Sequence, residues 1–192
     1  MATTAEPGTE VRSLTVEPLT IEAFAPFGDV LSVEGRDRLP INLYEGIDVY
    51  RADFESARPM EFLLTQNKVR EFRVLFLERH LELTQMFVSL GGDPFIQVVA
   101  KPDARMDNDV PAFDEIRAFM VPGNVGTNMH IGTWHEPPFA LVDDQVFLYT
   151  SHADLTVGLG ASLDQRKSIG ELDVDKRNVT EHGGYVLRLE MP

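Results

Sequence analysis

The chain has 192 residues, of which 43% are hydrophobic and 25% are charged, a composition typical of a globular protein of one domain. Its 17 Lys and Arg against 31 Asp and Glu give a net charge of −14, which argues against nucleic acid or anionic membranes as partners. The absence of cysteine excludes disulfides, thiolate catalysis and cysteine-based zinc sites. Without a long apolar run or a signal-like start, the sequence predicts a cytoplasmic protein.

The N-terminal segment Met1–Arg12 is small and polar, so we expect a disordered tail followed by a single domain over residues 13–192. A short strand is expected over Leu14–Leu19. Thr20 is then a suitable N-cap for a helical turn that reaches Phe24.

Short apolar runs with tight turns between them recur along the rest of the chain and predict strands. These runs are Val69–Leu77, Phe87–Leu90, Phe95–Ala100, Ile116–Val121, Phe139–Val142, Gln145–Thr150 and Tyr185–Leu189. Gly91–Pro94 has the composition of a hairpin turn, and Leu163–Lys176 is the one late helix candidate. The spacing predicts a mainly β protein, built as an antiparallel barrel or sandwich with a few short helices.

The segment Met120–Phe139 is the strongest candidate for an active site, because His130 and His135 bracket Trp134, the only tryptophan. Its glycines and prolines make it too turn-rich for a helix. Imidazoles can move protons near neutral pH, although a histidine beside a tryptophan is more often a packed residue. We expect the adjacent Glu136 to face solvent.

A second cluster has the spacing Glu78-x-His80-x4-Gln85-x6-Gly92, which resembles the first metal-binding motif of the cupin barrels. Glu78 replaces the first histidine of that motif and Gln85 replaces its glutamate. Together with His135, these residues are candidate ligands for a divalent metal. The alternative is a hydrogen-bonded polar cluster in the mouth of a barrel.

Four basic residues lie on or beside predicted strands, and one of them could face inward to bind a small carboxylate in two-point fashion. They are Arg73, Arg79, Lys101 and Arg117. For any one of them taken alone, a surface ion pair is the better interpretation.

The chain resembles the ureidoglycolate lyase family of allantoin degradation in five motifs that follow one another in the expected order. They are Leu19-x4-Phe24-x2-Phe27-Gly28-Asp29-Val30, Leu77-Glu78-Arg79-His80-x3-Thr84-Gln85-x-Phe87, Lys101-Pro102, Ile116-Arg117-Ala118-Phe119 and Gly126-x3-His130-x3-Trp134-His135-x2-Pro138. The resemblance implies a cupin-like homodimer that cleaves ureidoglycolate, a small carboxylate, to glyoxylate and urea.

On this reading the catalytic residues are His130, His135, Glu78 and His80. The substrate-binding residues are Arg79, Gln85, Lys101, Arg117 and Trp134, and no cofactor is required, although a divalent metal could bind. The chain departs from the family at Glu136, where a second histidine is usual, and after Tyr149. Two alternatives therefore stay open: a metal-dependent cupin isomerase or dioxygenase acting on another small acid, and a barrel that binds small acids without catalysis.

Overall fold

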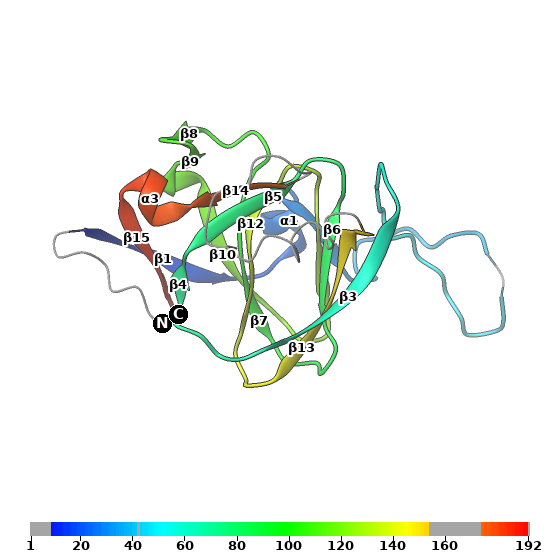
Figure 1. Cartoon of the computed structure of the whole chain (residues 1–192). Coiled ribbons are helices and arrows are strands. Elements are labelled where there is room, and N and C mark those ends of the chain that lie inside the picture. The colour runs from blue at the N-terminus through cyan, green and yellow to red at the C-terminus, as the bar shows by residue number, and fades with distance from the viewer. Residues whose placement is uncertain (1–8, 42, 154–173, 192) are drawn as a thin grey trace.

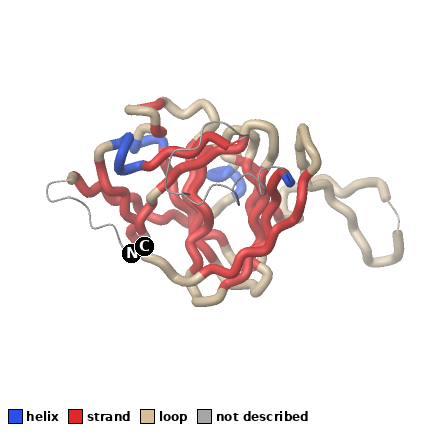
Figure 2. The backbone as a smooth tube through the Cα atoms, in the orientation of Figure 1, coloured by secondary structure: helices blue, strands red, loops and turns tan. Residues whose placement is uncertain are grey.

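The computed structural model describes residues 9–41, 43–153 and 174–191. It consists mainly of strands in two sheets, which confirms the predicted mainly β, cupin-like fold (Figures 1 and 2). The larger sheet has eight strands in the order β14 (Val174–Asn178), β5 (Phe76–His80), β12 (Trp134–Ala140), β7 (Phe95–Ala100), β10 (Ile116–Val121), β1 (Glu10–Pro18), β15 (Tyr185–Glu190) and β4 (Arg73–Val74).

The smaller sheet has five strands in the order β2 (Gly28–Leu31), β11 (Gly126–Met129), β6 (Gln85–Ser89), β13 (Gln145–His152) and β3 (Met60–Asn67). The remaining short elements are β8 (Met106–Asp107), β9 (Val110–Pro111), α1 (Ile21–Phe24), η1 (Phe113–Glu115) and α3 (Val179–Gly183). Pairing is not wholly antiparallel, because β1 runs parallel to both β10 and β15. No helix in the described part of the chain is long and apolar enough to cross a membrane.

Strand β7 lies between two hydrophobic cores, and all six of its residues are buried. Ile96, Val98 and Ala100 pack in one core with Trp134, while Val99 packs in the other beside Phe119. In Figure 1, β1, β15 and β4 lie on one side of the central strands β7, β10 and β12, and β6, β13 and β3 lie on the other. An unbroken apolar run is what a strand with two covered faces requires.

Several expected elements are confirmed. Strands β7 and β10 have the predicted bounds. Helix α1 begins after Thr20, whose Oγ1 accepts a hydrogen bond from Ala23 N at 3.1 Å. The glycine-rich segment before Trp134 contains one more strand than expected, β11, because Gly28 and Gly126 allow close pairing. A Cβ atom at Gly28 would lie 2.3 Å from the carbonyl oxygen of Asn128 on the paired strand.

Other expectations are wrong in detail. Gly91–Pro94 is not a hairpin turn, because β6 pairs with β11 and β13 whereas β7 pairs with β10 and β12, so the turn joins two sheets. Strand β1 already begins at Glu10, within the expected tail, where Arg12 lies 4.3 Å above the ring of Tyr185. The end of the helix expected over Leu163–Lys176 is strand β14, and the rest of that segment lies outside the described residues.

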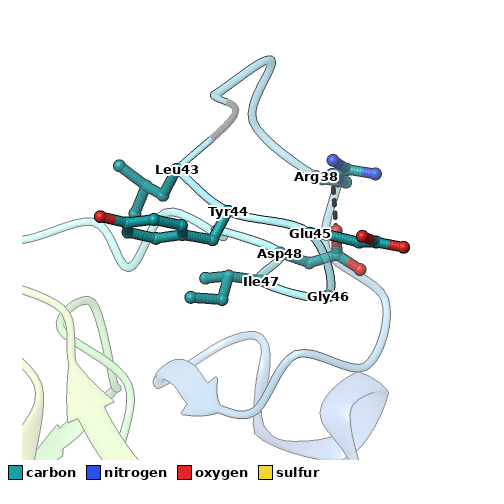
Figure 3. Close-up of a pocket in the computed structure, with 7 residues that line it drawn as sticks. All are labelled: Arg38, Leu43, Tyr44, Glu45, Gly46, Ile47 and Asp48. Carbon is teal, nitrogen blue, oxygen red and sulfur yellow. Dashed lines mark ion pairs between the residues drawn. The ribbon is translucent and has the colours of Figure 1, made fainter.

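An arm projects from the body between β2 and β3 (Figure 1). Its two limbs are joined by the hydrogen bond from Leu39 N to Val49 O at 2.8 Å and by the ion pair of Arg38 with Asp48. Figure 3 shows a pocket inside this arm, lined by Arg38 and by residues 43–48. The arm pocket shares no residue with the buried polar cluster described below.

Candidate active site

A buried polar cluster forms where β5 meets β12. Glu78 and His80 alternate along β5, and His135 of β12 is paired with Glu78, so all three side chains lie on one face of the larger sheet. Each offers a ligand atom, and these atoms lie within 4.8 Å of one another. The predicted association of Glu78 and His80 with His135 is therefore present in the fold.

The tautomer of His135 is fixed by its neighbour Thr133. Its Nδ1 lies 2.9 Å from the carbonyl oxygen of Thr133, which can only accept, so Nδ1 carries the proton. The lone pair is then on Nε2, which is buried and has no hydrogen-bond partner among the described residues. That atom lies 3.8 Å from Glu78 Oε1, and the His135 ring stacks on His80 at 5.6 Å.

Burial sets the protonation of the cluster. It lowers the pKa of His80 to about 4, helped by the neighbouring His135, and it also lowers the pKa of His135 although Glu78 opposes the shift. Burial raises the pKa of Glu78, but Lys176 and the two imidazoles outweigh it and hold that pKa below its usual value. At neutral pH the cluster therefore contains two neutral imidazoles and one carboxylate.

Lys176 completes the cluster, and sequence reasoning missed it. Strand β14 pairs with β5 so that Lys176 is opposite Glu78, and its Nζ lies 3.0 Å from Glu78 Oε2. Its side chain is 15% exposed, so the ion pair is largely shielded from water. The sequence offered no strand signal here, because Val174 is the only apolar residue of β14.

The smaller sheet supplies the opposite wall. The ring of Phe87 on β6 meets His135 at 6.2 Å, and Tyr149 on β13 stacks on Phe87 at 5.6 Å. Gln85, also on β6, is buried and donates through Nε2 to Thr150 O at 3.2 Å. Its side chain is near enough to His80 to raise the pKa of that imidazole slightly. Gln85 therefore faces the cluster from the second sheet, and its assignment as a binding residue stays a prediction.

Two predicted substrate-binding residues, Arg79 and Trp134, lie on the other face of the larger sheet. Neighbouring residues of a strand point in opposite directions, so Arg79 points away from Glu78 and His80. It pairs with Asp175 at 3.0 Å and lies 4.4 Å above the ring of Trp134, which is fully buried in the first core. Neither side chain contributes to the buried polar cluster.

The other predicted cations are also engaged elsewhere. Arg117 donates through Nε to Glu17 at 2.9 Å, and Lys101 lies 3.7 Å from Glu115. Arg73 lies 3.4 Å from Thr180 Oγ1. The expected inward-facing arginine is therefore not supplied by this set, and among the residues that the structure describes Lys176 is the cation that contacts the buried polar cluster.

His130 does not join His135 in the cluster. It occupies the turn between β11 and β12 with an exposed side chain, and its backbone N–H donates to Phe27 O at 3.0 Å. Gly132, at a φ of 84°, donates to His80 O at 2.7 Å and ties the turn to the end of β5. The second imidazole of the cluster is thus His80 rather than His130.

Glu136 is buried rather than solvent-exposed, contrary to expectation. Its Oε2 accepts the backbone N–H of Phe76 at 2.9 Å, and its Oε1 lies 3.0 Å from Arg70 Nη2. Burial raises the pKa of Glu136 to about 7, against the opposing effect of Arg70. On the face of β12 opposite to His135, this carboxylate joins β12 to the start of β5.

The donor set is suited to a divalent transition metal. Glu78, His80 and His135 offer one carboxylate and two neutral imidazoles, ligands that several such metals accept. The unpartnered His135 Nε2 fits this use, since a metal ligand must be deprotonated. The amide oxygen of Gln85, from the facing sheet, is a weaker candidate ligand.

Comparison with known proteins finds relatives over most of the chain. A family model described as ureidoglycolate lyase matches residues 11–166. A ureidoglycolate lyase of Azotobacter vinelandii is 34% identical over 161 residues, which cover 81% of this chain and 92% of that protein. One from Pseudomonas paraeruginosa is 35% identical, covering 81% and 90%, and one from Pseudomonas syringae pv. syringae is 38% identical, covering 72% and 82%. The chain belongs to the ureidoglycolate lyase family.

Proposed function

We propose that the protein is a carbon–nitrogen lyase that cleaves ureidoglycolate to glyoxylate and urea. The family and its named relatives support the reaction class. The observation that carries the proposal is the buried lone pair on His135 Nε2, held beside the ionised Glu78. This pair lies on the face of the larger sheet that contacts the smaller sheet through Phe87, and its burial keeps the lone pair away from water.

The reaction needs one proton to be moved and no electrons to be supplied. A base removes the proton of the substrate hydroxyl, and the oxygen electrons form the carbonyl of glyoxylate. The carbon–nitrogen bond breaks, its electron pair stays on nitrogen, and the nitrogen takes up a proton to give urea. A single group can perform both transfers if it lies beside both atoms.

In this proposal His135 is that group. Its lowered pKa keeps the imidazole neutral and ready to accept the hydroxyl proton on Nε2. Glu78, at 3.8 Å, stabilises the imidazolium that forms, while Thr133 holds the ring in its working tautomer. The imidazolium then returns the proton to the nitrogen of the departing urea.

Lys176 is proposed to bind the substrate carboxylate. Its charge is neutralised by Glu78 before the substrate arrives, in a chain whose net charge is −14. As Glu78 becomes paired with the His135 imidazolium, Lys176 becomes available to the carboxylate. Arg79 cannot take this role, because it faces the opposite side of β5.

Glu78, His80 and His135 would also hold a divalent ion, which would supply a positive charge able to polarise the substrate hydroxyl and carboxylate. The lone pair on His135 Nε2 can bind a metal or accept a proton, but not both at once. Its use as a base therefore requires no metal at this atom.

The decisive experiment incubates the purified protein with racemic ureidoglycolate and follows glyoxylate release. His135→Asn should lower kcat by about a hundred- to ten-thousandfold, the usual contribution of a general base. His130→Asn is the matched control, because His130 is exposed and outside the cluster. The proposal fails if wild type releases no glyoxylate, or if both variants turn over normally.

We further propose that the enzyme is a cytoplasmic homodimer acting in allantoin degradation, the role and assembly that the resemblance to the family implies. Support for pairing comes from β3, an edge strand on which Phe62 and Leu64 are 62% and 65% exposed. Apolar side chains on an open edge favour association with another copy. Light scattering should give a dimer mass for wild type and a monomer mass for Leu64→Lys.

A further inference from the structure

The edge strand β3 carries a carboxylate on the face of the smaller sheet that is turned toward the larger sheet. Glu61 is paired with Ser151 and Leu63 with Tyr149, so Glu61 and Tyr149 lie on the same face of the smaller sheet. Tyr149 stacks on Phe87, whose ring meets His135. Glu61 therefore lies on the face of the smaller sheet that is turned toward the buried polar cluster.

The pKa of Tyr149 gives separate support for this arrangement of Glu61 and the larger sheet. Burial raises the pKa of its hydroxyl, and the carboxylates of Glu78 and Glu61 both raise it further. Glu78 belongs to the larger sheet and Glu61 to the smaller one. A carboxylate from each sheet therefore acts on the Tyr149 hydroxyl, in agreement with the facing that the strand register gives.

Two acceptor atoms on the smaller sheet are buried without a donor. Glu61 Oε1 and Gln85 Oε1 have no hydrogen-bond partner among the residues the structure describes. Gln85 is 4% exposed, and its Nε2 is held by Thr150 O, so its amide cannot turn without losing that bond. A buried acceptor left unpaired destabilises the protein, and a ligand with N–H donors would remove that cost by pairing with it.

We propose that Glu61 and Gln85 form a subsite for the ureido end of the substrate, with Glu61 as the residue that determines specificity for it. The subsite rests on the proposed function and deepens it. A ureido group carries N–H donors on both of its nitrogens, and the two free acceptors complement them. The negative charge of Glu61 also directs the substrate carboxylate toward Lys176 on the other sheet.

The test uses ligands that cannot react. N-carbamoylglycine keeps the carboxylate and the ureido group of the substrate but lacks the hydroxyl, so it cannot be cleaved. N-acetylglycine differs from it by a methyl group in place of the terminal amino group. Wild type should bind N-carbamoylglycine at least about tenfold more tightly in calorimetry, since a hydrogen bond to a charged group is worth about 1.5–3 kcal/mol.

Glu61→Met removes the acceptor at similar size and should abolish the preference by weakening N-carbamoylglycine alone. Glu61→Gln keeps one acceptor oxygen and should restore part of the preference, and it serves as the test if the methionine variant does not fold. Glu71→Met is the control, because Glu71 is exposed and pairs with Arg188 at 3.3 Å.

Equal binding of both ligands by wild type, binding of neither, or an unchanged preference in both Glu61 variants would overturn the subsite. These binding results do not depend on turnover. Loss of preference in a protein that releases no glyoxylate would keep the subsite and reject the proposed reaction. If wild type releases glyoxylate but Glu61→Met keeps the preference for N-carbamoylglycine, the proposed reaction is kept and the subsite is rejected.

Discussion

Glu136 holds the backbone of Phe76, with its Oε2 2.9 Å from the amide nitrogen. The ladder between β12 and β5 contains one registered pair, His135 with Glu78. Pro137 and Pro138 follow at once and have no N–H to continue it. The Glu136 side chain thus takes the place of a backbone hydrogen-bond partner between β12 and β5, the two strands that carry His135, Glu78 and His80.

Glu136→Ala should therefore destabilise the protein by about 1–3 kcal/mol, because it leaves the Phe76 N–H unpaired and removes the carboxylate that pairs with Arg70. The free energy of unfolding in urea gives this value directly. Glu71→Ala, which removes an exposed carboxylate, is the control and should change it little. An equal, small effect of both substitutions would show that Glu136 does not hold the two strands together.

Lys176→Met should raise KM for ureidoglycolate by about tenfold or more, since a charge-assisted contact to the substrate carboxylate is lost. Arg79→Met should leave KM nearly unchanged, because Arg79 packs on Trp134 on the other face of β5. Steady-state kinetics of both variants shows which of the two residues binds the substrate carboxylate. A larger KM effect at Arg79 than at Lys176 would contradict the arrangement.

Acid should destabilise the native state through His80. Its pKa falls from 6.5 to about 4 on folding, so between these values the unfolded chain binds more protons than the folded one. Stability is accordingly lost as the pH falls from about 6.5 toward about 4, and His135 acts in the same direction. The melting temperature of His80→Asn should fall less over this interval, and parallel curves for the two proteins would contradict the assignment.

Removal of metal distinguishes the two uses of the His135 lone pair. With His135 as the base, we expect turnover to survive dialysis against a chelator, and added nickel or manganese to slow it by occupying Nε2. Elemental analysis alongside the rate measurement shows what is bound. A stoichiometric metal whose loss abolishes activity, with rescue on its return, would instead make Glu78, His80 and His135 ligands.

The sequence predicted the elements that local apolar patterning determines. Phe95–Ala100 and Ile116–Val121 are apolar runs with clear ends, and Thr20 has the side chain that a helix N-cap needs. The cluster of Glu78, His80 and His135 was also within reach, because its residue types and spacing point to proton transfer or metal binding. These features depend on the residues themselves and their near neighbours.

Features set by pairing were not predictable. Whether Arg79 or Glu78 faces the smaller sheet depends on which side of β5 that sheet covers, and alternation alone leaves both choices open. Lys176 reaches the site only through the pairing of β14 with β5, across almost a hundred residues of chain. His130 and His135 are five positions apart, but the turn at Gly132 separates them.

Strand β7 packs in both hydrophobic cores, so the contact between the two sheets depends on this one central strand. Its six buried residues are bonded to β10 on one side and β12 on the other. Amide protons of such a strand exchange with solvent only when the whole molecule opens. The free energy of opening measured by hydrogen exchange in β7 should therefore equal the free energy of global unfolding. Amides of the outer strand β3, which carries Glu61, should exchange sooner. The edge of the smaller sheet at β3 should therefore open more readily than the strands on either side of β7.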